Sequence, residues 1–258
     1  MNYQWSWTSF NDLSPDGLHS YLQTLLIGAG WTMALSVCAY MFALLLGSAI
    51  GVMRTVESKT ARAAAATYVE VFRNVPLLVQ MFLWYFVLPE LLPKALGTAI
   101  KQMPQPWNQF FPALLCLGFY ETARIAETLR SGIRALRAGQ RQAAFALGLT
   151  GFQAYRFVIL PQAFRVVVPP LTSEFMSMIK GSSVAMTIGL IELTGAARSM
   201  QEFSFHIFEA FSAATLIYFV INTSVVYGLM LFERRVATPA ARSRTASSAL
   251  AITEVEQS

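Results

Sequence analysis

Charged residues are scarce in this sequence, and their scarcity argues against an ordinary soluble domain. Of its 258 residues only 13% are charged and 55% are hydrophobic, whereas soluble domains carry about 25% charged residues. The net charge of +5 at pH 7 would suit a nucleic-acid partner, but a membrane protein with its positive residues on one side of the bilayer has the same excess. We therefore predict a membrane protein in contact with lipid, and no nucleic-acid partner.

Residues typical of metal binding and catalysis are also few. The two cysteines, Cys38 and Cys116, lie in apolar runs, where a thiol behaves as a small core side chain. The two histidines, His19 and His206, are far apart in the chain. The sequence lacks a P-loop, an H-E-x-x-H helix and a G-x-S-x-G turn, the motifs of several nucleotide-binding and hydrolytic sites. We predict no catalytic residue, no metal site and no cofactor in this chain.

Long stretches without charge predict an all-α protein with five transmembrane helices. A bilayer crossing needs about 20 apolar residues, and no Asp, Glu, Lys or Arg occurs from Gly17 to Met53. In this first span Gly47 and Gly51 form a small-xxx-small pattern that allows close helix packing. Proline is expected to bend or break two other spans. The expected spans are 24–52, 68–89 with a bend at Pro76, 111–130, 166–193 with a break at Pro169 and Pro170, and 210–232.

The positions of lysine and arginine predict the orientation of these spans. On one side the loops carry only Lys94, Lys101 and Arg198, whereas most other positive residues follow the first, third and fifth spans. The positive-inside rule then places the N-terminus outside and the C-terminus in the cytoplasm. Residues 1–20 do not begin with the basic segment of a secretory signal, so we expect a retained periplasmic lead-in. The polar tail, 236–258, is expected to be a disordered cytoplasmic segment.

The loop between the third and fourth spans combines positive charge with two short amphipathic stretches. Gly148 is placed to stop the first helix, and Thr150 with Gln153 forms a capping box that starts the second. The residue before a proline disfavours helix, so the second stretch is expected to end at Leu160-Pro161. These turns either pack against the membrane surface and neighbouring helices, or dock into a groove of a cytoplasmic partner.

This loop resembles the EAA loop of the permeases of ATP-binding-cassette (ABC) importers. The family pattern is Glu-Ala-Ala, three residues, Gly, nine residues, then Ile-x-Leu-Pro. The chain has Gln142-Ala143-Ala144, Gly148 and Val158-Ile159-Leu160-Pro161 at the same spacings, with Gln142 in place of Glu and Val158 in place of Ile. The resemblance implies a cytoplasmic coupling helix, formed by Gln142, Ala143, Ala144, Gly148, Leu160 and Pro161, that inserts into a groove of the ATPase. The loss of the glutamate charge puts one contact with that partner in doubt.

The resemblance continues over 21–235, the expected transmembrane permease domain. YVEVFRNVPLLVQ (68–80) and GQRQAAFALGLTGFQAY (139–155) are similar to the polar amino-acid branch of this family. LCLGFYETAR (115–124) and VVPPLTSEFMSMIK (167–180) resemble the glutamate/aspartate permeases within it. The resemblance implies a multi-pass subunit of the bacterial inner membrane that imports an acidic amino acid by alternating access. It also implies three kinds of partner: an ATPase dimer that binds ATP and Mg²⁺, a second, related permease, and a periplasmic solute-binding protein.

Ionisable residues within the expected spans mark a candidate substrate path, because such residues are costly in a membrane. Glu121, Arg124 and Glu127 follow one another at spacings of three, so Arg124 can pair with either neighbour on a helix. Arg124 belongs either to a neutralised cluster that holds the helices together or to the path, where a guanidinium suits a substrate carboxylate. We place Glu174 near the path and treat Glu127 and Lys180 as structural.

A helix break at Asn74 and Pro76 is a second candidate feature of the path, since transporters use broken helices at their substrate sites. The alternative is a simple proline kink. Two other functions stay open. One is a permease for a neutral or basic amino acid of the glutamine, arginine or histidine class. The other is a carrier driven by an ion gradient, although such carriers commonly contain internal repeats, and the sequence shows none.

Overall fold

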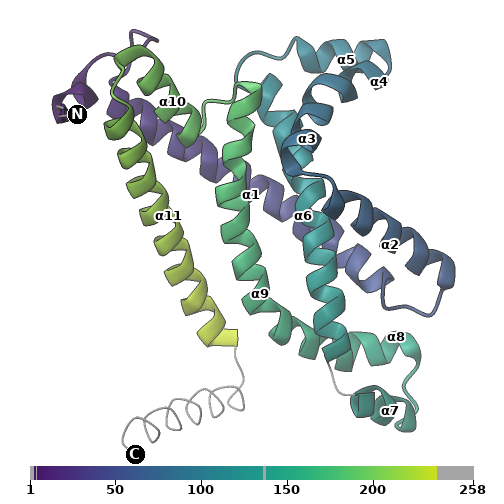
Figure 1. The fold of residues 1–258 in the computed structure, drawn as a ribbon. Helices are drawn as coiled ribbons and strands as arrows, with labels where there is room; N and C mark the ends of the chain where they lie inside the picture. Colours follow the sequence, from purple (N-terminus) through teal and green to yellow (C-terminus); the bar gives the residue numbers. More distant parts are fainter. Residues whose placement is uncertain (1–2, 4, 136–137, 237–258) are drawn as a thin grey trace, which may run out of the picture.

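The computed structural model describes residue 3, residues 5–135 and residues 138–236, and every regular element in this part of the chain is helical (Figure 1). Most of the predicted tail therefore lies outside the described residues. The elements are η1 (Trp7–Asn11), α1 (Tyr21–Met53), α2 (Lys59–Asn74), α3 (Leu77–Phe82), η2 (Leu83–Val87), α4 (Leu88–Leu91), α5 (Lys94–Lys101), α6 (Trp107–Ala135), α7 (Ala138–Ala146), α8 (Gly151–Ala154), η3 (Tyr155–Ile159), α9 (Leu160–Gly181), η4 (Ser182–Ile188), α10 (Leu193–Ser204) and α11 (Ile207–Val236).

The long helix α1 is the element on which the others assemble, and it passes behind α6, α9 and α11 in Figure 1. It begins at a capping box in which the Ser20 amide donates to Gln23 Oε1 at 2.9 Å. Its closest approach to α6 needs glycine: a Cβ at Gly47 would lie 2.9 Å from the Cβ of Ile125, and one at Gly51 would lie 2.9 Å from the Cβ of Leu129. The predicted small-xxx-small contact is confirmed.

The chain turns by 100° between α2 and α3, at the proline where the sequence predicts a bend. Val75 is extended (ψ 129°), as expected of a residue before proline. The carbonyls left without donors at the end of a helix need other partners. Here the donor is the side chain of the buried Gln80, whose Nε2 donates to the carbonyls of Phe72 at 2.8 Å and Val75 at 2.9 Å. The helix before the bend, α2, begins at Lys59 with Ser58 as its N-cap, whereas the sequence predicted a start at residue 68.

The predicted break at Pro169 and Pro170 is wrong, because α9 runs through both prolines without interruption. Proline in a helix removes backbone donors, but neighbouring helices and side chains can satisfy the carbonyls that are left. The fourth helix instead changes after Gly181, where the tighter turn η4 ends at Gly189 with φ +87°. The loop that carries Lys94 and Lys101 is also partly helical, because these two residues are the ends of α5.

Two helices are long and apolar enough to cross a membrane, Tyr21–Met53 and Ile207–Leu231, and the bent pair of Lys59–Asn74 and Leu77–Leu91 makes a third if it forms one span. Helices α6 and α9 are comparably long but carry acidic and basic residues along their length. The described structure thus gives an all-helical protein with clear apolar spans, and the full count of five stays a prediction.

A buried carboxylate, which the sequence analysis did not single out, joins three helices at one end of the molecule. Glu192 is fully buried and caps α10, accepting hydrogen bonds from the amides of Thr194 at 3.0 Å and Gly195 at 2.9 Å. It also accepts from Thr32 Oγ1 of α1 at 3.1 Å and from the Tyr218 hydroxyl of α11 at 2.9 Å. These four donors satisfy a charge that would otherwise be costly to bury.

The N-terminal lead-in is tied to the start of α11. Buried Glu209 accepts hydrogen bonds from the amide of Ser6 at 2.7 Å and from the hydroxyl of Tyr3. Helices α5 and α10 lie with this lead-in at one end of α6 and α9, whereas α7 and α8 lie at the other end (Figure 1). The two loops that the sequence assigns to opposite sides of the membrane are therefore at opposite ends of the protein.

Candidate functional site

The first short helix of the predicted coupling loop, α7, stops where the sequence indicates. Gly148 has φ +76°, a conformation that glycine adopts without strain. Its amide donates to the carbonyl of Phe145 at 2.9 Å, and the Leu149 amide donates to the carbonyl of Ala144 at 3.1 Å. These two bonds form a Schellman motif, so the predicted helix stop is confirmed.

The second short helix begins at the predicted capping box but does not end at the predicted place. The Thr150 amide donates to Gln153 Oε1 at 2.9 Å, and Thr150 Oγ1 accepts from the Gln153 amide at 3.3 Å. The expected end at Leu160-Pro161 is wrong, because the chain continues through a π-helical turn, Tyr155–Ile159, directly into α9. The wider π turn lies where the ring of Pro161 would otherwise meet the backbone of the preceding turn.

The surface of this loop is apolar and exposed. Gln142, Ala143 and Pro161 are exposed, Leu160 is half-buried, and only Ala144 among the EAA positions is buried. Leu147 and Phe152 are 81% and 73% exposed, so these side chains do not pack into the rest of the described chain. The predicted loop therefore presents an unpartnered apolar surface on either side of Gly148.

One side of the loop rests on the turn between α1 and α2. The Tyr155 hydroxyl donates to the carbonyl of Thr55 at 2.9 Å, across the space between the two segments. Val52, Thr55, Phe145, Phe152 and Tyr155 are among the residues that line a cavity of about 730 Å³ there. This contact links the loop to the end of α1 as well as to α9.

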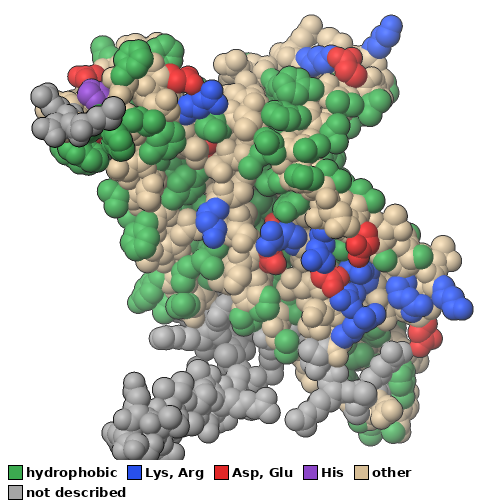
Figure 2. Space-filling model, in the orientation of Figure 1, with side chains coloured by type: hydrophobic (Ala, Val, Ile, Leu, Met, Phe, Trp, Pro, Cys, Tyr) green, Lys and Arg blue, Asp and Glu red, His purple; other side chains and the backbone are tan. Residues whose placement is uncertain are grey.

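A charged cavity of about 370 Å³ lies between α2, α6 and α9. Its volume is within the range of roughly 300–1,000 Å³ found for small-molecule sites. Four of its lining residues come from one stretch of α6, where positions three and four apart share a face. The described residues that line it are Arg73, Tyr120, Arg124, Glu127, Thr128 and Glu174. Figure 2 shows basic and acidic side chains gathered over α2 and α6, with apolar side chains on much of the remaining visible surface.

The ion pairs around this cavity include one that the sequence spacing allows and one that it does not indicate. Arg124 pairs across the helices with Glu174, with Nη2 2.5 Å and Nε 2.7 Å from Glu174 Oε2. Glu121 Oε2 is 3.8 Å from the Arg124 guanidinium. Of the two partners that the sequence spacing allows Arg124, Glu121 is therefore within ion-pair distance, whereas Glu127 instead binds Arg54 and Arg130. The structure thus brings Arg124 and Glu174 together, which the sequence spacing had not indicated.

The other two predicted path residues do not line the cavity, whereas a neighbouring residue does. Asn74 Nδ2 donates to Glu70 Oε2 at 3.3 Å on the surface of α2, and Pro76 is the exposed N-cap of α3. Arg73, one residue earlier, is the member of this segment that reaches the cavity. The sequence analysis did not single it out as a site residue. The proline that bends the chain after Arg73 was the feature of the sequence that pointed to this part of the cavity.

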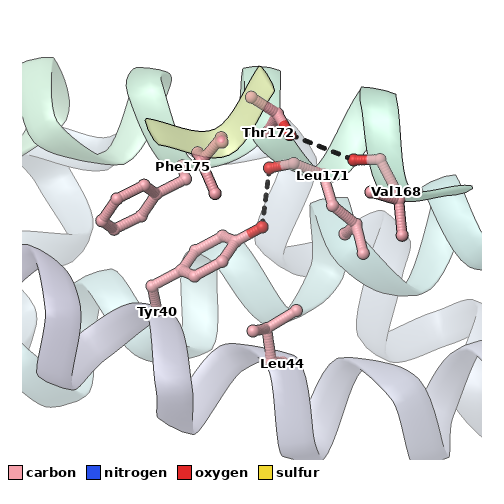
Figure 3. A pocket seen from close by; sticks show the side chains of 7 residues that line it. Tyr40, Leu44, Val168, Leu171, Thr172 and Phe175 are labelled. Carbon is pink, nitrogen blue, oxygen red and sulfur yellow. Dashed lines mark hydrogen bonds between the residues drawn. The ribbon is translucent and has the colours of Figure 1, made fainter. Parts of the chain in front are cut away.

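A second cavity, of about 190 Å³, lies between α1, α9 and α11 and is apolar (Figure 3). The Tyr40 hydroxyl donates to the carbonyl of Leu171 at 2.6 Å beside it. Phe175 faces this cavity, while the preceding Glu174 faces the charged one. None of its described lining residues is charged. Charged side chains that could bind a ligand therefore line the first cavity, and the described lining of the second has none.

Comparison with known proteins identifies the family to which this architecture belongs. Residues 39–238 match the family described as the binding-protein-dependent transport system inner membrane component. The chain belongs to this family. It is 45% identical over 240 residues to the glutamate/aspartate import permease protein GltJ of Escherichia coli (strain K12), covering 93% of this chain and 98% of the relative.

Two further relatives bear on assembly and fold. The glutamate/aspartate import permease protein GltK of Escherichia coli O6:H1 is 29% identical over 235 residues, covering 91% of this chain and all of the relative. The crystal structure of an amino acid ABC transporter with histidines matches with a TM-score of 0.71 and 34% identity, covering 83% of this chain and 95% of that one. The expected ABC permease family is thereby confirmed.

Proposed function

We propose that this chain is the permease subunit of an ABC importer that moves glutamate or aspartate into the cytoplasm by alternating access. The charged cavity is the observation that supports this most directly, because an acidic amino acid carries two carboxylates and one ammonium group. Arg73 and Arg124 can bind carboxylates, and Glu174 can bind an ammonium group. The similarity to GltJ supports the same substrate.

In this proposal the chain crosses the bacterial inner membrane five times. The spans are α1, the bent pair of α2 with α3 and α4, α6, α9 and α11. The N-terminal lead-in then lies in the periplasm, and the α7–α8 loop and the C-terminal end of α11 lie in the cytoplasm. The placement of the lead-in and this loop at opposite ends of the helices supports that topology (Figure 1).

The proposed transporter needs three kinds of partner. ATP and Mg²⁺ are bound by a dimer of a separate ATPase chain, since this sequence contains no P-loop. A second permease completes the pathway, and the existence of two relatives, GltJ and GltK, with glutamate/aspartate import names supports a pair of different chains. A periplasmic solute-binding protein delivers the amino acid to the outer end.

The exposed loop is proposed to carry movement between the ATPase and the membrane helices. Leu147 and Phe152 supply an apolar surface of the kind that fills a groove on a partner. Gln142 and Ala143 are exposed on α7, and the unbroken run from α8 through Leu160 and Pro161 into α9 is a stiff connection. A displacement of the loop is then transmitted along α9 to Glu174.

The Arg124–Glu174 pair is proposed to be part of the substrate path. When the pair opens, its guanidinium and carboxylate can bind the opposite charges of an amino acid, and re-forming it after release closes the path. The bend around Asn74 and Pro76 contributes by placing the end of α2 at the cavity wall. A permease for glutamine or a basic amino acid is the second candidate, because the cavity also contains carboxylates.

Uptake by the reassembled transporter tests this function. Labelled glutamate, aspartate, glutamine and arginine are offered to vesicles that contain this chain, its permease partner, the ATPase and the binding protein, with and without ATP. ATP-dependent uptake of the two acidic amino acids is expected. Preferred uptake of glutamine or arginine would replace the proposed substrate, and uptake that ignores ATP but needs an ion gradient would overturn the importer mechanism.

A further inference from the structure

Arg73 is the charged residue of the cavity whose partner the described structure does not supply. It lies in the last turn of α2, immediately before the 100° bend, and its side chain lines the charged cavity. Among the described residues, no carboxylate oxygen lies within 4.0 Å of its guanidinium. Its charge therefore faces a polar space without an ion pair.

The other charged residues that line the cavity, together with their ion-pair partners, form a cluster in which the charges balance. Every other arginine in it has a carboxylate partner within 4.0 Å: Arg54, Arg124 and Arg130. Every carboxylate in it likewise has an arginine partner: Glu121, Glu127 and Glu174. The positive charge that remains available for a ligand is therefore that of Arg73. Arg73 is itself exposed, so an arriving anionic group can reach its guanidinium and pair with it.

We propose that Arg73 binds a carboxylate of the transported amino acid, and that the Arg124–Glu174 pair receives the solute's other charged groups. This inference rests on the proposed function and assigns a residue of the binding site to it. A guanidinium suits the role, because its planar N–H groups bind both oxygens of a carboxylate. Position suits it too, since Arg73 lies in the last turn of α2 and its side chain lines the cavity, beside a bend whose carbonyls Gln80 holds in place.

Arg62 offers a matched control on the same helix. The difference between 73 and 62 is 11 residues, which is about three turns, so both side chains emerge from nearly the same face of α2. Arg62 is exposed, as Arg73 is, but it is not among the described residues that line the cavity. Arg62→Gln removes the same charge from the same helix without changing the proposed site.

The test is amino-acid binding by the purified, nucleotide-free complex of the two permeases and the ATPase, without the solute-binding protein. Equilibrium binding of labelled glutamate is measured, with competition by glutamine, which lacks the side-chain carboxylate, and by 4-aminobutyrate, which lacks the α-carboxylate. Arg73→Gln is expected to weaken glutamate binding about 10–100-fold, the loss typical of a hydrogen-bonded charge pair. Arg73→Lys should retain part of the affinity, and Arg62→Gln all of it.

The competitors identify which carboxylate Arg73 binds. If Arg73→Gln weakens the binding of glutamate and of glutamine to the same extent but leaves the binding of 4-aminobutyrate unchanged, Arg73 binds the α-carboxylate. If the substitution lowers the affinity for glutamate more than the affinity for glutamine, Arg73 binds the side-chain carboxylate. Either pattern supports the proposal, because a general structural defect would weaken all three ligands equally.

Other outcomes separate this proposal from the proposed function. If the wild-type complex takes up glutamate with ATP and Arg73→Gln binds it with an unchanged Kd, the role of Arg73 is overturned and the importer function stands. An unchanged Kd with loss of co-purified anionic lipid would assign the residue to a lipid headgroup instead. If the complex with Arg73→Gln does not assemble, Arg73→Lys is measured in its place. A Kd for glutamate that rises several-fold supports the proposal, and an unchanged Kd contradicts it.

Discussion

Replacing Gly148 with valine is expected to separate ATP hydrolysis from amino-acid uptake. Gly148 has φ +76° and ends α7 at the loop proposed to contact the ATPase. A Cβ at this position would meet nothing within 4 Å, so the penalty comes from the backbone and not from a clash. Holding a residue with a side chain in this conformation costs about 1–2 kcal/mol, and a β-branched residue lies at the upper end.

A cost of that size is large for one loop and small for the whole complex. About 1.4 kcal/mol changes an equilibrium tenfold, so the angle between α7 and α8 should shift toward other conformations in most molecules. The transmembrane helices do not depend on this turn and should still assemble. We therefore expect uptake per ATP hydrolysed to fall at least several-fold while the complex elutes intact from size-exclusion chromatography.

Two variants make this expectation specific. Gly151→Ala changes the same loop, where a Cβ also meets nothing within 4 Å but φ is not positive, and it should retain coupling. Gly148→Asn should retain most of it, because asparagine tolerates the left-handed conformation. The assay is labelled glutamate uptake and phosphate release in the same vesicles. Wild-type uptake per ATP in Gly148→Val would refute the reasoning.

Three further substitutions test the packing and charges described above. Gly47→Leu should lower the melting temperature of the purified complex, because overpacking costs about 1–3 kcal/mol; Gly30→Leu, with no atom within 4 Å of its Cβ, should not. Glu192→Ala should destabilise the junction of α1, α10 and α11 by about 1–3 kcal/mol through its unpaired donors, measured by denaturant melts. Arg124→Gln should reduce glutamate uptake at least tenfold by leaving Glu174 unpaired, and an unchanged rate would remove Arg124 from the path.

Local signals predicted much of the loop and of the helix packing. The stop at Gly148 and the capping box at Thr150 depend on a few neighbouring residues, and both are confirmed. The close contact at Gly47 is made with a distant helix, but the spacing of small residues within α1 indicates it. The bend at Pro76 was also predictable, because proline restricts the residue before it. The helix stop, the capping box and the bend follow from backbone conformations that neighbouring residues determine without reference to distant segments.

The errors concern features that depend on distant or non-local partners. Pro161 and Pro169 were expected to end or break helices, but a π turn and the packing of a membrane helix accommodate them. The pairing of Arg124 with Glu174 joins residues 50 positions apart, and helical spacing cannot reveal it. The role of Glu192 was missed for the same reason, since two of its four donors come from α1 and α11.

Coupled uptake in vesicles with no ion gradient tests the importer function most directly. The complete transporter is reconstituted with ATP on the ATPase side, ionophores collapse all ion gradients, and labelled glutamate and glutamine are offered together with the binding protein. An acidic amino-acid importer should accumulate glutamate above its external concentration only with ATP, and prefer it to glutamine. Accumulation that ceases when the ion gradients are collapsed, whether or not ATP is present, would contradict the proposed mechanism.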